Sequence, residues 1–389
     1  MLSLALAVSL VYLATALASP VNETLNAPRK IGKRCTGIIE SLADVPAAQE
    51  CLTINIAGFT VPAGETFALA PPDGAVVSMT GQITFAFQEW AGPLMKITGN
   101  SITFNGNKLH RKLHFHLKKQ ADTDTQATIS PGMAINTGMV LGLAQAFKKP
   151  DPMLVVAMSG TFENVQIVNS PGRAVAIEGS SLTVSGVNVN NAAGAVPNSR
   201  SNGAPAGANT DGFDVAANNV RIQNSVDDCL AINGGTNIVF TGNSCTGGHG
   251  ISIGSINSNT IVSTVTISDN VVINNGNGLR IKTDATATGS TVSNVIYTGN
   301  TLSGITGFGV LIDQSYPAVL GTPGTGVIID GVTFSGTNTI SVDSTAHRVE
   351  VNCGSNSCVG TWSENFAGLT VSGGTGSTVK NAPVTGGSF

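Results

Sequence analysis

Apolar and polar positions alternate in short runs along most of this chain, and Asn, Gly or Ser bounds each run. Typical runs start at Asn164, Asn219 and Asn237, where an apolar residue follows directly and again two positions later. Such alternation between turn residues predicts short strands. Equivalent positions recur at spacings of 18, 27, 30 and 32 residues, at Val220, Ile238, Val265, Val295 and Val327. A loose period above roughly 20 residues indicates a solenoid.

The fold class predicted by this pattern is all-β. No helical pattern separates the strands, which disfavours a βαβ sheet, and recurring units with Asn at the turns favour a parallel β-helix over a β-sandwich. Charged residues make up only 11% of the chain, which also has 47 Gly. Low charge argues against disorder, and abundant Gly, Asn, Ser and Thr argue against helix. One solenoid can hold all of residues 35–389.

The amino-terminal segment is typical of a processed leader. Residues 2–18 are apolar and end in Ala16-Leu17-Ala18, which predicts a signal peptide over residues 1–18 rather than a membrane anchor. Residues 19–34 end in Lys33-Arg34, which predicts a propeptide; a charged linker is the alternative. No later segment is apolar for long enough to span a bilayer. We therefore expect a secreted, extracellular protein without a membrane contact after processing.

Net charge limits the partners. Loss of residues 1–34 would remove four of the 19 basic and one of the 23 acidic residues, which lowers the net charge from −4 to −7. A nucleic-acid binder would carry a basic stripe instead. An acidic ligand would therefore require local cations.

Six cysteines follow residue 34, and they form three couples that are close in sequence. An even number behind a signal peptide favours disulfides over a metal site. Six cysteines allow fifteen connectivities, so nearest-neighbour pairing is a hypothesis. It joins Cys35 to Cys51, Cys229 to Cys245, and Cys353 to Cys358.

Residues 108–149 interrupt the strand pattern. They contain seven of the 19 basic residues and three of the five histidines, His110, His114 and His116. The histidines lack an accompanying Cys or carboxylate pattern, so a metal site is disfavoured. We expect an atypical insertion on the solenoid surface.

Four clusters carry residues suited to chemistry. They are Asn209–Asp214, Asp227–Cys229, Gly247–Gly250 and Arg280–Lys282. Each cluster alone is compatible with an ordinary turn or an exposed strand. In a β-helix, however, equivalent places in successive coils stack, so the clusters can converge on one patch. Crowded carboxylates raise one another's pKa, which suits an acid and base pair for glycosidic cleavage. Arg and Lys bind a sugar carboxylate by charge-assisted hydrogen bonds.

These clusters resemble the four ordered motifs of the fungal endopolygalacturonases: NTD at Asn209–Asp211, DD at Asp227-Asp228, GHG at Gly248–Gly250 and RIK at Arg280–Lys282. The segments 85–95, 247–255 and 307–316 are similar to family segments as well. The resemblance covers most of residues 35–389 apart from the insertion. As a set the motifs are highly specific, although each alone is weak.

The resemblance implies a right-handed parallel β-helix that hydrolyses α-1,4-galacturonosyl linkages in polygalacturonate or pectin, with endo action and inversion. It implies Asp227 as general acid, Asp211 and Asp228 as the groups that activate water, and His249 as a residue that tunes protonation. Arg280, Lys282, Tyr316 and Asn209 would bind substrate. It implies no cofactor or metal, and we expect a monomer.

Two alternatives remain open. A pectate or pectin lyase would use the same fold class with a base and, for pectate, calcium. A catalytically impaired homologue would bind pectin without cleaving it. For the second alternative, the stretch between Asp214 and Asp227 is shorter than in the family, and Ser225-Val226 replace the family's Asn-Gln before Asp227.

Overall fold

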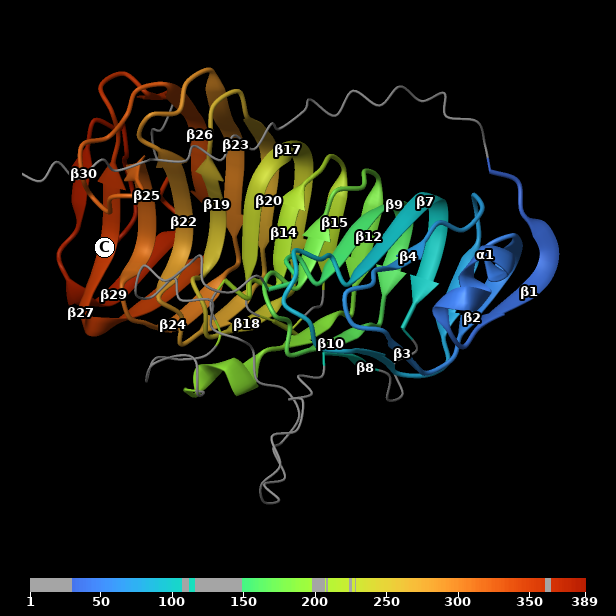
Figure 1. Cartoon of the computed structure of the whole chain (residues 1–389). Coiled ribbons are helices and arrows are strands. Elements are labelled where there is room, and N and C mark those ends of the chain that lie inside the picture. The colour runs from blue at the N-terminus through green and yellow to red at the C-terminus, as the bar shows by residue number, and fades with distance from the viewer. Residues whose placement is uncertain are drawn as a thin grey trace, which may run out of the picture.

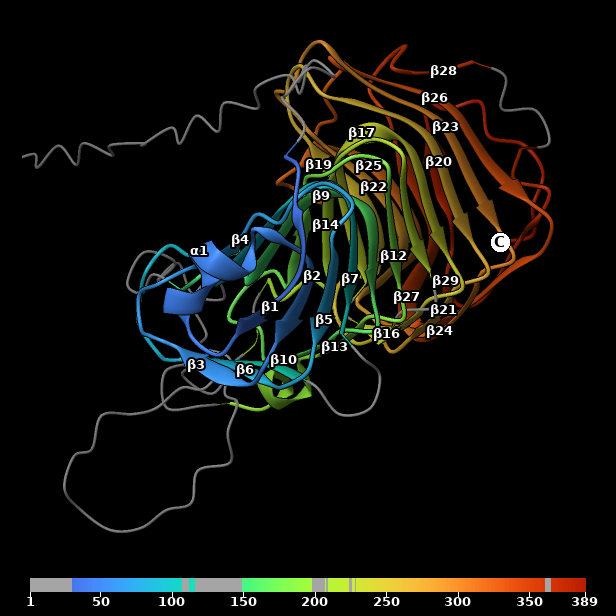
Figure 2. The ribbon, with the colours of Figure 1, turned by 90° about the vertical axis from the view of Figure 1, so that its right-hand side faces the viewer.

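The computed structural model describes residues 30–106, 112–115, 149–197, 207, 209–223, 226–227, 229–360 and 365–389, although the side chains of residues 112–115, 223 and 226–227 lie outside that description. Strands dominate it, and every pairing between them is parallel. The chain winds into a right-handed parallel β-helix, which confirms the predicted fold class (Figure 1). Figure 2 looks closer to the solenoid axis and shows the strands stacked along it.

Three parallel sheets make the walls of the solenoid. The first, which we call the groove sheet, contains β4 (Phe67–Leu69), the first part of β7 (Met95–Asn105), the first part of β9 (Leu154–Glu163), β11 (Val175–Ile177), β14 (Phe213–Ala216), the first part of β17 (Leu230–Thr241), β19 (Ile251–Ile256), β22 (Asn277–Asp284), β25 (Phe308–Tyr316), the end of β27 (Asn338–Asn352) and β30 (Thr378–Lys380).

The second sheet contains β1 (Lys33–Ile39), β2 (Cys51–Ile56), β5 (Val76–Met79), the later parts of β7, β9 and β17, β12 (Leu182–Ser185), β15 (Val220–Gln223), β20 (Ile261–Ser268), β23 (Ser290–Thr298), β26 (Val327–Ser335) and β28 (Cys358–Val359).

The third sheet contains β3 (Phe59–Val61), β6 (Ile83–Phe85), β8 (Lys112–Phe115), β10 (Gln166–Val168), β13 (Asn188–Asn190), β16 (Val226–Asp227), β18 (Ser244–Thr246), β21 (Val271–Ile273), β24 (Thr301–Ile305), the start of β27 and β29 (Leu369–Thr375). The short helices are η1 (Leu42–Asp44), α1 (Val45–Ala48) and η3 (Ala192–Ala195), and α1 lies at the amino-terminal end of the solenoid (Figure 1).

The core fills the space between the three sheets with the inward residues of each strand. Ile and Val dominate it, and rings stack between coils, as in the pair Tyr297 and Phe334 with centroids 4.8 Å apart. Burial of apolar side chains from every coil is the main stabilising term. The alternation read from the sequence is therefore the alternation between core and surface.

Asparagine shapes the corners in two ways. Asn164, Asn219 and Asn237, which start the runs noted above, all adopt positive φ near 57°. Asn tolerates this left-handed conformation better than most residues. A second set of four is buried and forms a ladder, in which the side-chain oxygens of the last three accept the backbone N–H of the equivalent Asn one coil earlier. Its members are Asn243, Asn270, Asn300 and Asn338.

Disulfides close both ends of the solenoid. Cys35–Cys51 joins β1 to β2 in the first coil, and Cys353–Cys358 closes a turn in the last coils. These two predicted pairings are confirmed. The third predicted couple, Cys229 and Cys245, is buried, and its pairing stays a prediction. The strand register places Cys245 beside Asp227, and the Cys229 Sγ lies 3.7 Å from the Asn275 Oδ1.

Part of the expected insertion belongs to the solenoid. Lys112–Phe115 form β8, which lies between β6 and β10 in the third sheet. His114 is therefore a strand residue by its backbone, whereas His110, His116 and residues 116–148 lie outside the described residues, as do the predicted signal peptide and residues 19–29 of the predicted propeptide. The dibasic pair Lys33-Arg34 opens β1. No helix in the described ranges is long and apolar enough to cross a membrane.

Candidate active site

The groove sheet brings the sequence motifs into one line. Phe213, Leu230 and Ile251 begin successive strands of this sheet, and Leu279 stands in register with Ile251. Asp211 and His249 each precede their strand by two residues, so they occupy the same row on different coils. Coils of a parallel sheet are about 4.8 Å apart. Motifs that are far apart in sequence therefore become close neighbours.

A groove of about 730 Å³ lies where the groove sheet meets the third sheet. Six of the predicted site residues line it: Asn209, Asp211, His249, Arg280, Lys282 and Tyr316. The β13 residues and the turn that follows them line the opposite wall. The structure thus gathers these six residues, whereas their individual roles stay predictions.

Cations stand side by side at one end of the groove. Arg280 and Lys282 lie on β22, where strand alternation sends both side chains outward while Ile281 is buried in the core. The Arg280 Nε donates to the Ser252 Oγ at 3.0 Å, and the Lys282 Nζ lies 5.0 Å from the centre of the Tyr316 ring. Both contacts are with neutral groups.

Burial perturbs these cations. Desolvation lowers the pKa of Arg280, and desolvation together with the neighbouring Arg280 charge lowers the pKa of Lys282 to about 8. The negative charge of Asp211 opposes both shifts but does not cancel them. Cations whose pKa values are lowered by burial in this way are typical of functional sites.

His249 sits on a corner that only glycine allows. Gly250 has φ of 87°, and a Cβ at this position would meet the Asn277 carbonyl oxygen at 2.2 Å. The Gly250 N–H donates to the side chain of buried Asn275 at 3.0 Å. Burial lowers the pKa of His249, and the Arg280 and Lys282 charges lower it further against the raising effect of Asp211. The imidazole is therefore neutral at neutral pH.

The paired carboxylates of the DD motif are only partly located. The backbone of Asp227 ends β16, and its neighbour in the next coil is Cys245. The Asp227 side chain and all of Asp228 lie outside the described residues.

The corner that follows β16 is short. Asp227 pairs with Cys245, and Ala231 pairs with Ser252. The corner from Asp227 to Ala231 therefore spans four residue steps, whereas the equivalent corner on the next coil, from Cys245 to Ser252, spans seven. This difference lies after Asp227, whereas the shortened stretch noted in the sequence lies before it, between Asp214 and Asp227.

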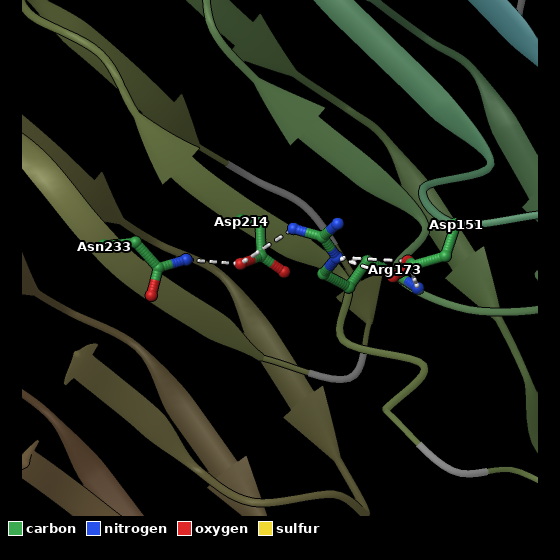
Figure 3. Close-up of polar contacts among 4 residues, drawn as sticks. All are labelled: Asp151, Arg173, Asp214 and Asn233. Atoms are coloured by element: carbon green, nitrogen blue, oxygen red, sulfur yellow. Dashed lines mark hydrogen bonds and ion pairs between the residues drawn. The ribbon is translucent and has the colours of Figure 1, made fainter. Parts of the chain in front are cut away.

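Sequence reasoning missed a charged cluster beside Asp211. Arg173 begins the coil before Asp211, and its Nε donates to Asp151 at 3.0 Å while its Nη1 lies 3.8 Å from the Asp214 carboxylate (Figure 3). Asn233 also donates to Asp214 at 2.5 Å. Burial is the largest cause that raises the pKa of Asp214, to about 6, and Arg173 opposes it. Asp214 belongs to the NTD run and was within reach of sequence reasoning, but nothing in the sequence singled out Arg173.

The arrangement suits acid–base chemistry on an anionic ligand. Asp211 interacts electrostatically with His249, Arg280 and Lys282, so carboxylate and cations share one site. Glycosidic cleavage by inversion needs two carboxyl groups on opposite sides of the bond. Within the described residues, no group of three or more His, Cys, Asp or Glu side chains is arranged to hold a metal ion.

Fold and groove together define a carbohydrate-active enzyme of the parallel β-helix class. Comparison with known proteins specifies the class further. Residues 139–388 match the model of the glycosyl hydrolases family 28, and the chain belongs to this family. It is therefore a glycoside hydrolase, and the lyase alternative has no support.

Relatives from fungi match almost the whole chain. A probable endopolygalacturonase A of Aspergillus parasiticus is 36% identical, with 92% of this chain and 93% of the relative covered. An endo-polygalacturonase of Sclerotinia sclerotiorum is 38% identical, with 90% and 88% covered. Among solved structures, endopolygalacturonase I from Stereum purpureum, complexed with two galacturonates, is 40% identical with a TM-score of 0.78 and covers 91% of this chain and 100% of its own.

Proposed function

We propose that this protein hydrolyses internal α-1,4-galacturonosyl linkages of polygalacturonate and pectin, with inversion and direct attack by water. The observation that carries this proposal is the pair Arg280 and Lys282 facing Asp211 and His249 in one groove. Arg280 and Lys282 contact neutral groups, and a polymer with a carboxylate on every sugar supplies anionic partners for them. The similarity to endopolygalacturonases over most of the chain supports the same substrate.

Substrate binding is assigned to the cation end of the groove. Arg280 and Lys282 hold a galacturonate carboxylate by charge-assisted hydrogen bonds. Tyr316, 38% exposed beside Lys282, offers its ring to the adjacent sugar. Asn209, exposed at the opposite part of the groove, offers an amide to sugar hydroxyls.

Catalysis is assigned to the carboxylates. Asp227 protonates the leaving glycosidic oxygen, and Asp211 with Asp228 accepts a proton from the water that attacks the anomeric carbon. This mechanism requires roughly 6.5–9.5 Å between the acid and base carboxyls, which leaves room for the water. His249 donates or accepts a hydrogen bond near the acid and thereby adjusts its protonation.

Endo action follows from where the groove lies. The row from Arg173 to Tyr316 crosses six successive coils on the outside of the solenoid, a length of about 24 Å at the usual strand spacing. A polysaccharide can pass along such a surface without presenting an end. We propose that the protein acts outside the cell as a monomer; the two disulfides are consistent with an oxidising compartment.

A second candidate is a protein that binds pectin but cleaves it poorly. The short stretch between Asp214 and Asp227 favours it, because fewer residues there alter where the backbone carries Asp227 and Asp228. An error of about 1 Å in a catalytic group can cost on the order of 100-fold in rate. An insertion of about three residues between Ser225 and Val226 tests this candidate: a large gain in rate would support it, and a loss would show that the present spacing before Asp227 is the active one.

The proposed hydrolysis is tested by the products of polygalacturonate digestion. New reducing ends without a rise in ultraviolet absorbance, and a rapid fall in viscosity, indicate internal hydrolysis. Release of single galacturonate units with little fall in viscosity would contradict endo action.

A further inference from the structure

We propose that Asp313 is a positioning residue that holds Tyr316 over the cation end of the groove. The proposal rests on the function proposed above, in which Tyr316 contacts the sugar. Asp313 lies on β25 and stands in register with Lys282 on the previous coil. Its side chain is 3% exposed and does not line the groove, so it acts on substrate only through other residues.

Four hydrogen bonds converge on the Asp313 carboxylate. Its Oδ1 accepts from the Ser315 N–H at 3.1 Å, the Ser315 hydroxyl at 2.7 Å and the Asn352 Nδ2 at 2.9 Å. Its Oδ2 accepts from the Leu320 N–H at 2.8 Å. A carboxylate this deeply buried needs such donors, because the loss of its hydration would otherwise be very costly. Three of the four donors come from the turn that carries Tyr316.

That turn, residues 313–321, is closed around the same carboxylate. The Ser315 hydroxyl oxygen also lies 2.8 Å from the Ala318 carbonyl, an alternative acceptor for its single proton, and it accepts the Gly321 N–H at 2.9 Å. Asn352 also donates to the Gly321 carbonyl at 3.1 Å. Asp313 and Asn352 thus tie both ends of the turn to the β-helix.

Leu320 shows that the turn is constrained rather than relaxed. Its φ is 52°, a left-handed conformation that a Leu side chain disfavours. Strained residues persist only where the surroundings fix them, and they cluster at functional sites. The bond from the Leu320 N–H to Asp313 is the contact that fixes it here. Without Asp313, the turn is free to relax, and Tyr316 moves with it.

The first experiment measures the contact between Tyr316 and Lys282 and needs no activity. Lysines are methylated with a ¹³C label, and Lys282 is assigned by comparison with Lys282→Arg. The Tyr316 ring, 5.0 Å away, shifts the Lys282 resonance, and Tyr316→Ala removes that shift. Asp313→Asn should remove it as well, because the new amide must turn an NH₂ group toward a donor.

The matched control is the next residue. Gln314 is fully buried, but its side chain contacts the Val327 carbonyl and the Gly354 N–H. Gln314→Glu is the same acid–amide exchange in the opposite sense, at equal burial. It should lower the melting temperature while leaving the ring-induced shift of Lys282 in place.

The kinetic arm is a double-mutant cycle. Asp313→Asn should lower kcat/KM for polygalacturonate about tenfold, but it should add little in the Tyr316→Ala background. If Asp313→Asn does not fold, Leu320→Pro replaces it, because proline removes the N–H donor from a solvent-exposed turn and cannot adopt positive φ.

The outcomes separate the two proposals. A Lys282 resonance that keeps its shift in Asp313→Asn or Leu320→Pro overturns the positioning role. A full kinetic effect of Asp313→Asn in the Tyr316→Ala background overturns it too. Loss of the shift together with unchanged activity of Tyr316→Ala would leave the positioning role supported and instead refute the sugar contact of Tyr316.

Discussion

Two regions of the groove sheet hold positive charge in opposite ways: the cluster around Arg173, which lies outside the groove lining, and the cation end of the groove. Arg173 lies between Asp151 and Asp214, and the bond to Asp151 and the carboxylate charges raise its pKa in spite of burial. Arg280 and Lys282 contact Ser252 and Tyr316 instead, and their pKa values are lowered. In the Arg173 cluster, carboxylates of the protein itself neutralise the cation. At the cation end of the groove, Arg280 and Lys282 can instead bind an anionic ligand.

This difference separates a structural use of charge from a functional one. The carboxylates around Arg173 neutralise its charge and stabilise the fold. The neighbouring cations Arg280 and Lys282 lower the stability of the fold until an anionic substrate binds. Trade-offs of this kind are common where a site is built for function.

Arg280→Gln removes one of the two positive charges at the cation end of the groove. We expect kcat/KM for polygalacturonate to fall about 100-fold, since a charge-assisted hydrogen bond to the sugar carboxylate is lost. Stability should rise by about 0.5–1 kcal/mol, because one of two neighbouring buried cations is removed. Steady-state kinetics and thermal melting measure both effects. A variant that loses activity and stability together would count against the contrast.

The pH dependence of kcat/KM tests Lys282. Its pKa of about 8 means that the ammonium is charged below about pH 8 and loses its proton above it. We expect kcat/KM, which reports the free enzyme, to fall as pH rises through this value. Lys282→Arg keeps the charge and should move this alkaline limb upward. An unchanged limb in that variant would assign it to another group.

Stability should follow the opposite sign for the same group. Between about pH 8 and the ordinary lysine pKa of 10.5, the unfolded chain keeps the proton that folded Lys282 has lost. Unfolding then binds a proton, so the contribution of Lys282 to stability increases with pH in this window. Lys282→Met should remove that slope. Denaturant unfolding at a series of pH values measures it.

Arg173→Gln removes the cation of the Arg173 cluster, and its main effect should be on the free energy of unfolding. Asp214 is 7% exposed and would lose the cation that opposes its raised pKa. We expect a loss of about 1–2 kcal/mol, reduced from the value for a fully buried pair because Arg173 is partly exposed. Arg221→Gln, on the second sheet away from the groove, is the control. A purely kinetic effect with full stability would place Arg173 with the substrate-binding cations.

Ser252→Ala should have the smallest effect. It removes the hydroxyl that accepts from the Arg280 Nε at 3.0 Å. Loss of one neutral acceptor should lower kcat/KM only about threefold to tenfold, because the guanidinium keeps its charge and its other donors. Ser252→Thr, which keeps the hydroxyl, should restore most of the activity. A loss as large as that of Arg280→Gln would mean that Ser252 itself contacts substrate.

Much of the fold was accessible from the sequence. The spacing of apolar positions predicted a solenoid, and the Asn residues that start the runs are those that turn the corners. The resemblance to a family then led to six residues that share one groove. Each of these features depends on local sequence repeated at equivalent positions, which periodicity reveals directly.

Other features depend on register and could not be read in this way. The place of Lys112–Phe115 in the third sheet follows from pairing with β6 and β10, and the alternation of its own four residues did not reveal it. The position of Cys245 beside Asp227 on the previous coil likewise follows only from the strand register. The sequence did not single out Asp313, because its donors Leu320 and Asn352 lie 7 and 39 positions away.

The most direct test compares the wild-type chain with Asp227→Asn in the release of reducing ends from polygalacturonate. We expect clear release by the wild type and a loss of about 1,000-fold or more in the variant, because the leaving oxygen then lacks its proton donor. If the folded wild type released nothing, or if Asp227→Asn matched it, the assignment of this groove to acid-catalysed hydrolysis would be contradicted.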